Sequence, residues 1–141
     1  MSNQENKLKH LEMIQGVISR MAGNAFFLKG WTVTLLSALF ALYLKDPSIN
    51  YFTLGLIPLL IFWWLDSFYL SQERKFRRLY DNVRKLKETE IDFSMNTDID
   101  IFRNDDYFSL KNCAFSVTIR LFYLYPSLII LLFVFMPLFV K

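Results

Sequence analysis

Residues 51–70 read YFTLGLIPLLIFWWLDSFYL, and they continue without a turn signal into SQERKFRRLYDNVRKLK at 71–87. Twenty helical residues extend roughly 30 Å, which matches the hydrocarbon thickness of a bilayer. The aromatic residues Trp63, Trp64 and Tyr69 precede a cluster of cations that begins at Arg74. Tryptophan and tyrosine favour membrane interfaces, and cations favour the cytoplasmic side. The stretch therefore predicts a membrane helix that leaves the bilayer on the cytoplasmic side and continues into water.

The composition of the whole chain is that of a membrane protein. Hydrophobic residues make up 54% and aromatic residues 18% of its 141 residues, which is more apolar surface than one small soluble core can bury. The net charge of +3 conceals a local asymmetry. Segment 71–87 carries seven Lys or Arg and two acids, whereas segment 88–106 carries one Arg and seven acids. Local charge is therefore more informative here than net charge.

Residues that could support catalysis or metal binding are scarce. The chain has one cysteine, Cys113, and one histidine, His10, so the sequence excludes an intrachain disulfide and the paired ligands of a zinc site. It also contains no nucleophile–base pair, no glycine-rich phosphate loop and no carboxylate pair typical of a soluble active site. We therefore expect no enzymatic activity, no cofactor and no metal.

The chain before residue 51 predicts two further helical segments. We expect residues 1–24 to form a cytoplasmic amphipathic helix, residues 25–44 the first membrane helix, and residues 45–50 an external turn. Helices 25–44 and 51–70 then form an antiparallel hairpin. The amphipathic helix follows from apolar residues at steps of three and four, the spacing of one helical face: Leu8, Leu11, Ile14, Ile18 and Met21.

Small residues recur every seven positions along the same segment. In a continuous helix they form a slowly drifting stripe where another backbone could approach closely. A chance distribution is the alternative, and we favour helix packing. The stripe consists of Gly16, Gly23, Gly30 and Ser37.

Two charges inside the predicted hairpin lie at mirror positions. Lys29 and Asp66 are equally far from the centre of the turn, between Pro47 and Ser48, so an antiparallel hairpin places them opposite each other. A charge at bilayer depth costs about 2.5–3.5 kcal/mol on insertion scales and usually finds a partner. The alternative is that both lie at headgroup level, with Lys29 extending its amine into water and Asp66 solvated.

Segment 71–116 predicts a small cytoplasmic module of mixed α and β structure. An apolar helical stripe continues through Leu79 and Val83, and it requires a covering partner. Alternation of apolar and polar residues then has the period of two that is typical of strands. One extended strand, a local hairpin or two strands that pair with another subunit would all fit this alternation. The apolar positions are Ile91, Phe93, Met95, Ile99 and Ile101.

Residues 117–140 predict a third membrane helix, kinked or locally broken at Pro126. Eleven Lys and Arg lie in 1–29 and 71–87, against Lys45 and Lys141 on the other side. The amino terminus and segment 71–116 are therefore expected in the cytoplasm, and the carboxyl terminus outside. The predicted fold class is an all-α membrane protein with three transmembrane helices, the amphipathic amino-terminal helix and the small α+β module.

Two runs of this sequence resemble a known family. HLEMIQGVISRMAGNAFFLKGWTVTLLSALFAL at 10–42 and WWLDSFYLSQERKFRRLYDNVR at 63–84 are similar to small bacterial membrane effectors of anti-phage operons, notably the Hailong type paired with a nucleotidyltransferase. The resemblance covers about half of the chain. It implies an oligomeric channel in the bacterial inner membrane, held shut until a nucleotide or oligonucleotide binds its cytoplasmic part, whose opening collapses the membrane potential.

The cations of 71–87 are the candidate ligand-binding residues. They could serve as a topology signal, attract anionic lipid, or capture a polyanion such as a single-stranded oligonucleotide. We expect a homo-oligomeric, ligand-gated ion channel that acts in anti-phage defence. The alternative is a non-conducting membrane anchor or scaffold that recruits a cytoplasmic partner protein. The candidate ligand-binding residues are Arg74, Arg77, Arg78, Arg84, Lys85 and Lys87.

Overall fold

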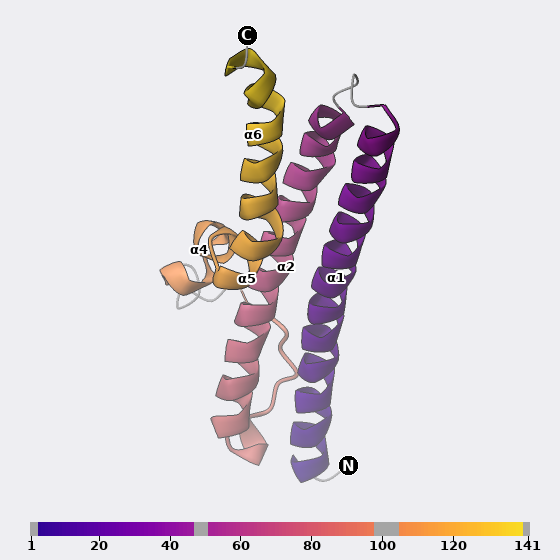
Figure 1. Ribbon diagram of the computed structural model, residues 1–141. Coiled ribbons are helices and arrows are strands. Elements are labelled where there is room, and N and C mark those ends of the chain that lie inside the picture. Colours follow the sequence, from indigo (N-terminus) through magenta and orange to yellow (C-terminus); the bar gives the residue numbers. More distant parts are fainter. Residues whose placement is uncertain (1–2, 47–50, 98–104, 140–141) are drawn as a thin grey trace.

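A hairpin of two long helices forms the body of the molecule. The computed structural model describes residues 3–46, 51–97 and 105–139, with the backbone alone at 51–52 and 133–139. Helix α1 spans Asn3–Lys45 and helix α2 spans Tyr51–Lys85. The two lie side by side and run antiparallel (Figure 1). At 1.5 Å per residue they are about 64 and 52 Å long, so both extend well beyond the roughly 30 Å of a hydrocarbon layer.

Each long helix has an apolar half and a polar half. We call residues 25–45 with 51–70 the apolar half of the hairpin, and residues 3–24 with 71–85 its polar half. Among the described residues, α1 and α2 are the two helices long and apolar enough to cross a membrane. Only 17% and 22% of their most apolar windows are buried inside the molecule. This surface is suited to lipid or to other copies of the chain, because a core helix of a soluble protein would be mostly buried.

Two separate hydrophobic clusters lie along the hairpin. In the polar half, Ile14 and Ile18 of α1 pack against Leu79 and Val83 of α2. In the apolar half, Leu59 of α2 packs against the carboxyl-terminal segment of the chain. The residues that this segment contributes are Ile119, Tyr123 and Ile130.

The predicted α+β module is wrong, because no strand forms among the described residues. After α2, the chain forms the short helix η1, Glu88–Glu90, and then runs extended through residues 91–97. Here side chains replace the hydrogen bonds of a sheet. Asp92 Oδ1 accepts from the Ser94 N–H at 2.9 Å, and the Ser94 carbonyl lies 3.0 Å from His10 Nε2. Phe93 has φ of 55°, which interrupts the extended backbone.

The extended segment 91–97, which we call the strap, lies against the polar half of the hairpin (Figure 1). Ile91 and Met95 pack against the cluster formed by Ile14, Ile18, Leu79 and Val83. The apolar stripe of the polar half is therefore covered by the chain's own strap. The predicted strand positions Ile99 and Ile101 lie outside the described residues.

The predicted third membrane helix is also wrong, because the described residues contain no arrangement of three membrane-length helices. Segment 117–139 is divided into α5 at Val117–Ile119, the π-helical η3 at Arg120–Leu124 and α6 at Tyr125–Phe139. The Tyr125 N–H bonds to the Arg120 carbonyl, five residues earlier, just before Pro126. Proline lacks an N–H and clashes with the preceding turn, and a wider π turn accommodates it. The fifteen residues of α6 extend only about 22 Å.

Two short helices join the hairpin to this last segment. Helix η2 spans Asp106–Phe108 and helix α4 spans Leu110–Ala114. The Ser109 hydroxyl caps α4 by accepting from the Asn112 N–H. Both helices pack on α2 near its middle, and α6 then follows the apolar half of α2 (Figure 1).

Leu79→Ala should destabilise the polar half by about 2–5 kcal/mol, because Leu79 is 6% exposed in a cluster where the lost volume leaves a cavity. Leu86→Ala is the control, since Leu86 is 37% exposed and its truncation should change stability by less than about 0.5 kcal/mol. Thermal unfolding in detergent, followed by circular dichroism, measures both. If both variants lose the same amount of stability, Leu79 is not packed in this cluster.

Candidate functional site

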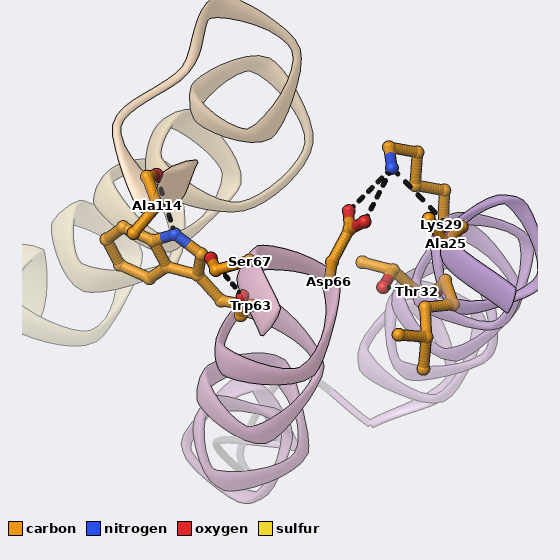
Figure 2. Close-up of polar contacts among 8 residues, drawn as sticks. Ala25, Lys29, Thr32, Trp63, Asp66, Ser67 and Ala114 are labelled. Atoms are coloured by element: carbon orange, nitrogen blue, oxygen red, sulfur yellow. Dashed lines mark hydrogen bonds and ion pairs between the residues drawn. The ribbon is translucent and has the colours of Figure 1, made fainter. Parts of the chain in front are cut away.

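An ion pair joins the two long helices inside the apolar half. Lys29 Nζ lies 2.6 Å from Asp66 Oδ2 and 2.8 Å from Asp66 Oδ1, so the amine contacts both carboxylate oxygens. Figure 2 shows the two side chains reaching toward each other from α1 and α2. The Asp66 side chain is 1% exposed, whereas the Lys29 side chain is 18% exposed. The structure thus brings together the two charges that the mirror argument places opposite each other.

The neighbouring hydroxyls of Thr32 and Ser67 bond to carbonyl groups of their own helices. Thr32 donates to the Leu28 carbonyl at 2.8 Å, and Ser67 donates to the Trp63 carbonyl at 2.6 Å. The Lys29 amine makes one further, longer contact of 3.4 Å with the Ala25 carbonyl. Direct contact between the half-buried Lys29 amine and the buried Asp66 carboxylate offsets much of the cost of burying the carboxylate. Removing either partner would leave an uncompensated charge.

A cavity of about 270 Å³ opens beside the ion pair. We call it the charged cavity, because Lys29, Asp66 and Glu73 line it together with Thr118 of α5. Asp66 and Glu73 are seven residues apart and share one face of α2. Glu73 also pairs with Arg77 at 2.7 Å. A row of charges therefore begins in the apolar half at the ion pair and continues into the polar half.

The six candidate cations of segment 71–87 fall into two groups. Arg74, Arg77 and Arg78 line one cavity of about 360 Å³, which we call the arginine pocket. Its other walls are Asp81 of α2 and the residues Asp105, Tyr107 and Phe108. Arg74 is fixed there, since its Nη1 donates to the Tyr107 carbonyl at 2.7 Å and its guanidinium lies 4.3 Å from the centre of the Tyr107 ring.

The second group lies at the far end of α2. Arg84 and Lys85 are exposed on its last turn, and Lys87 is exposed at the start of η1. Arg84 makes a long ion pair of 3.5 Å with Asp81. None of these three residues lines the arginine pocket. The structure therefore separates cations that are grouped together in the sequence.

The small-residue stripe makes no close approach to any other part of the chain that the structure describes. A Cβ added at Gly16, Gly23 or Gly30 would meet nothing within 4 Å, and Ser37 is exposed. The close approach occurs instead at Gly55, where a Cβ would collide with Leu39. The stripe thus remains open on the surface of α1.

Sequence reasoning missed a line of hydrogen bonds that fastens the segment 105–115 to α2. Trp63 Nε1 donates to the Ala114 carbonyl at 3.0 Å, and the Ser71 hydroxyl donates to the Phe108 carbonyl at 2.6 Å. With the Arg74 bond to Tyr107, these contacts form what we call the α2–α4 seam. Positions 63, 71 and 74 share one helical face, which is the only signal of the seam in the sequence.

No group of three or more His, Cys, Asp or Glu side chains suited to a metal ion occurs in the part of the chain that the structure describes. Comparisons with protein-family models, with curated proteins and with solved structures return no match. The charged cavity, the arginine pocket and the membrane-length helices are the features of the molecule that bear on its function.

We expect Lys29→Ala and Asp66→Ala each to lower the free energy of unfolding. The double variant should lower it by about 1–3 kcal/mol less than the sum of the two single losses. The reason is that each single change leaves one charge of the pair without its partner, whereas the double change removes both charges. Unfolding in detergent supplies the four free energies of the cycle. The exposed pair Arg84 and Asp81 is the control, with a coupling below about 1 kcal/mol. Additive effects at Lys29 and Asp66 would contradict a coupled pair.

Cys113 should react slowly with maleimide in the folded protein. It is fully buried on α4, and this burial raises the pKa of its thiol above the ordinary value, an effect that the nearby Arg74 only partly opposes. Less thiolate is therefore present at pH 8, and reagent access is poor. Labelling followed by mass spectrometry should show a rate at least about tenfold below that of Lys111→Cys in a Cys113→Ser background. Equal rates would place Cys113 at the surface.

Proposed function

We propose that the chain is a subunit of an oligomeric, ligand-gated ion channel in a membrane. The observation that carries this proposal is the charged cavity beside the Lys29–Asp66 pair, within the helices that are long and apolar enough to cross a bilayer. Ionisable groups at this depth are costly, and in membrane proteins they commonly mark ion or substrate pathways. The cavity brings the charged side chains of Lys29, Asp66 and Glu73 together where the surrounding helix is apolar.

Several copies are needed for conduction, because one hairpin with a short third helix cannot enclose a hydrated path by itself. The exposed apolar side chains of α1 and α2 supply area for association within the membrane. The open stripe at Gly16, Gly23 and Gly30 allows a second backbone to approach α1 closely. In such an assembly the charged cavities of neighbouring copies would surround a common axis.

The gating signal is proposed to bind at the far end of α2. Arg84, Lys85 and Lys87 lie about 20–25 Å beyond Leu70 along the chain, which is too far for contact with headgroups around an upright helix. In an oligomer, the cationic ends of several α2 helices would lie near one another. Their positive electrostatic potentials would add and attract a polyanion. A nucleotide or single-stranded oligonucleotide made by a partner nucleotidyltransferase is the ligand that the family resemblance suggests, with depolarisation of a bacterial inner membrane as the outcome.

Current across a planar bilayer that contains the purified protein tests this proposal. Short single-stranded oligonucleotides and nucleoside triphosphates are added to each side in turn as probes. A channel should give discrete current steps whose frequency depends on one of these probes. A protein that remains electrically silent with every probe, while mass measurement shows an intact oligomer, would instead be a membrane anchor or scaffold.

Replacing Arg84, Lys85 and Lys87 together by Gln should abolish the response to the active probe and flatten the salt dependence of its binding, because counterion release requires those cations. The matched control replaces three cations elsewhere, namely Lys9, Arg20 and Lys75. Protease protection in vesicles verifies that both variants insert with the orientation of the parent protein. If the variant without Arg84, Lys85 and Lys87 responds normally to the probe, these three cations do not bind the ligand and serve only as a topology signal.

A further inference from the structure

The α2–α4 seam has two cavities along its length, one polar and one apolar. The polar cavity is the arginine pocket, between α2 and η2. The apolar cavity has a volume of about 220 Å³ and lies between α2 and α4, where Trp63, Trp64, Leu110 and Phe115 line it. We call it the apolar slot. The rings of Trp63 and Phe115 meet edge to face, with centroids 6.0 Å apart and planes at 84°.

Charges in the arginine pocket are only partly neutralised within the chain. Arg77 pairs with Glu73, and Asp81 makes its long pair with Arg84. Arg74, by contrast, bonds to uncharged oxygens, those of Tyr107 and of the Asn112 side chain. Arg78 pairs with no carboxylate among the described residues. Two guanidinium groups are therefore available for an anion, and planar guanidinium donors are well matched to phosphate oxygens.

The same pocket also presents negative charge. Asp105 has one carboxylate oxygen engaged by the Tyr107 N–H at 2.9 Å, and its side chain lines the cavity. Asp81 lines the cavity from α2. A ligand that carried phosphate alone would face these two carboxylates. A ligand with a phosphate and a nearby ammonium would match both signs.

The pocket lies at the outer edge of the headgroup layer of a bilayer. Arg74 and Arg78 follow Leu70, the last residue of the apolar half, by four and eight residues, or about 6 and 12 Å of helix. The headgroup layer begins where the hydrocarbon ends and is on the order of 5–8 Å thick on each side. Arg74 falls within that layer, and Arg78 lies a few Å beyond it, with a long side chain that tilts toward the helix N-terminus and therefore toward the membrane. The apolar slot, near Trp63 and Ser67, is about two to three helical turns, or roughly 10–16 Å, nearer to the bilayer centre than Arg74.

We propose that the α2–α4 seam binds one phospholipid molecule whose headgroup carries a phosphate and a primary ammonium, as in phosphatidylethanolamine. The phosphate contacts Arg74 and Arg78, and the ammonium lies toward Asp81 and Asp105. The first part of an acyl chain enters the apolar slot against Trp63 and Phe115. A soluble phosphate compound would fill the pocket and leave the slot empty. This site is separate from the gating site at Arg84, Lys85 and Lys87, so the proposal goes beyond the function described above.

Native mass spectrometry of the detergent-purified protein measures this binding directly. Phosphatidylethanolamine, phosphatidylcholine and phosphatidylglycerol with identical acyl chains are titrated in turn. We expect phosphatidylethanolamine to bind about tenfold more tightly than the other two, because trimethylammonium cannot donate hydrogen bonds to the carboxylates and glycerol carries no charge for them. Equal binding of all three lipids would overturn the proposal.

Matched variants locate the site. Arg78→Gln should weaken binding of phosphatidylethanolamine about tenfold, by loss of a charge-assisted contact to phosphate. Lys75→Gln removes a positive charge at nearly the same depth but outside the pocket, and it should change binding less than about twofold. Equal effects of the two variants would indicate a diffuse electrostatic attraction to headgroups, which would overturn the assigned site.

Two further measurements identify the occupant. Phe115→Ala should weaken phosphatidylethanolamine binding by removing a wall of the slot, and Phe115 is 57% exposed, so its truncation leaves the core intact. Glycerophosphoethanolamine, which has the headgroup without acyl chains, should compete only at much higher concentration. If it competes as well as the lipid, or if a nucleoside triphosphate displaces the lipid at equal concentration, the pocket holds a soluble phosphate compound and the lipid proposal is overturned.

Discussion

The contact between Lys29 and Asp66 fixes the register of the two long helices. An apolar interface between membrane-length helices tolerates sliding, since one aliphatic side chain packs nearly as well as the next. The contact of the Lys29 amine with both oxygens of the buried Asp66 carboxylate favours one alignment, because a shift of one turn would leave the buried carboxylate without its cation. With that register fixed, Ile14 and Ile18 meet Leu79 and Val83 in the polar half.

The second organising element is a neighbouring face of α2. Trp63, Ser71 and Arg74 donate hydrogen bonds to backbone carbonyl groups of the segment 105–115. This arrangement places Tyr107, α4 and the start of α5 at the boundary between the apolar and polar halves. The charged cavity and the arginine pocket both lie at that boundary, on different faces of the same helix.

Sequence reasoning was most successful where the structure depends on spacing along a helix. The apolar runs indicate α1 and α2, and the mirror positions of Lys29 and Asp66 follow from two helices with the same rise per residue. The strap shows where such reasoning fails. Ile91, Phe93 and Met95 alternate in the same way whether the backbone pairs with a strand or, as here, with the side chains of Asp92 and His10. Hydropathy also carries no signal of the π turn before Pro126 or of side chains that bond to distant carbonyls.

An unbroken helix such as α1 acts as a stiff lever. Its 43 residues contain no proline, and the ion pair holds it near residue 29, off centre. About 39 Å of helix lies on the amino-terminal side of this fulcrum and about 24 Å on the other side. A sideways displacement of the amino-terminal end would therefore reappear at the opposite end reversed in direction and reduced to roughly three fifths. The strap contacts α1 at His10, far from residue 29 along the helix, so a small force applied there would turn the helix more effectively than the same force applied close to the ion pair.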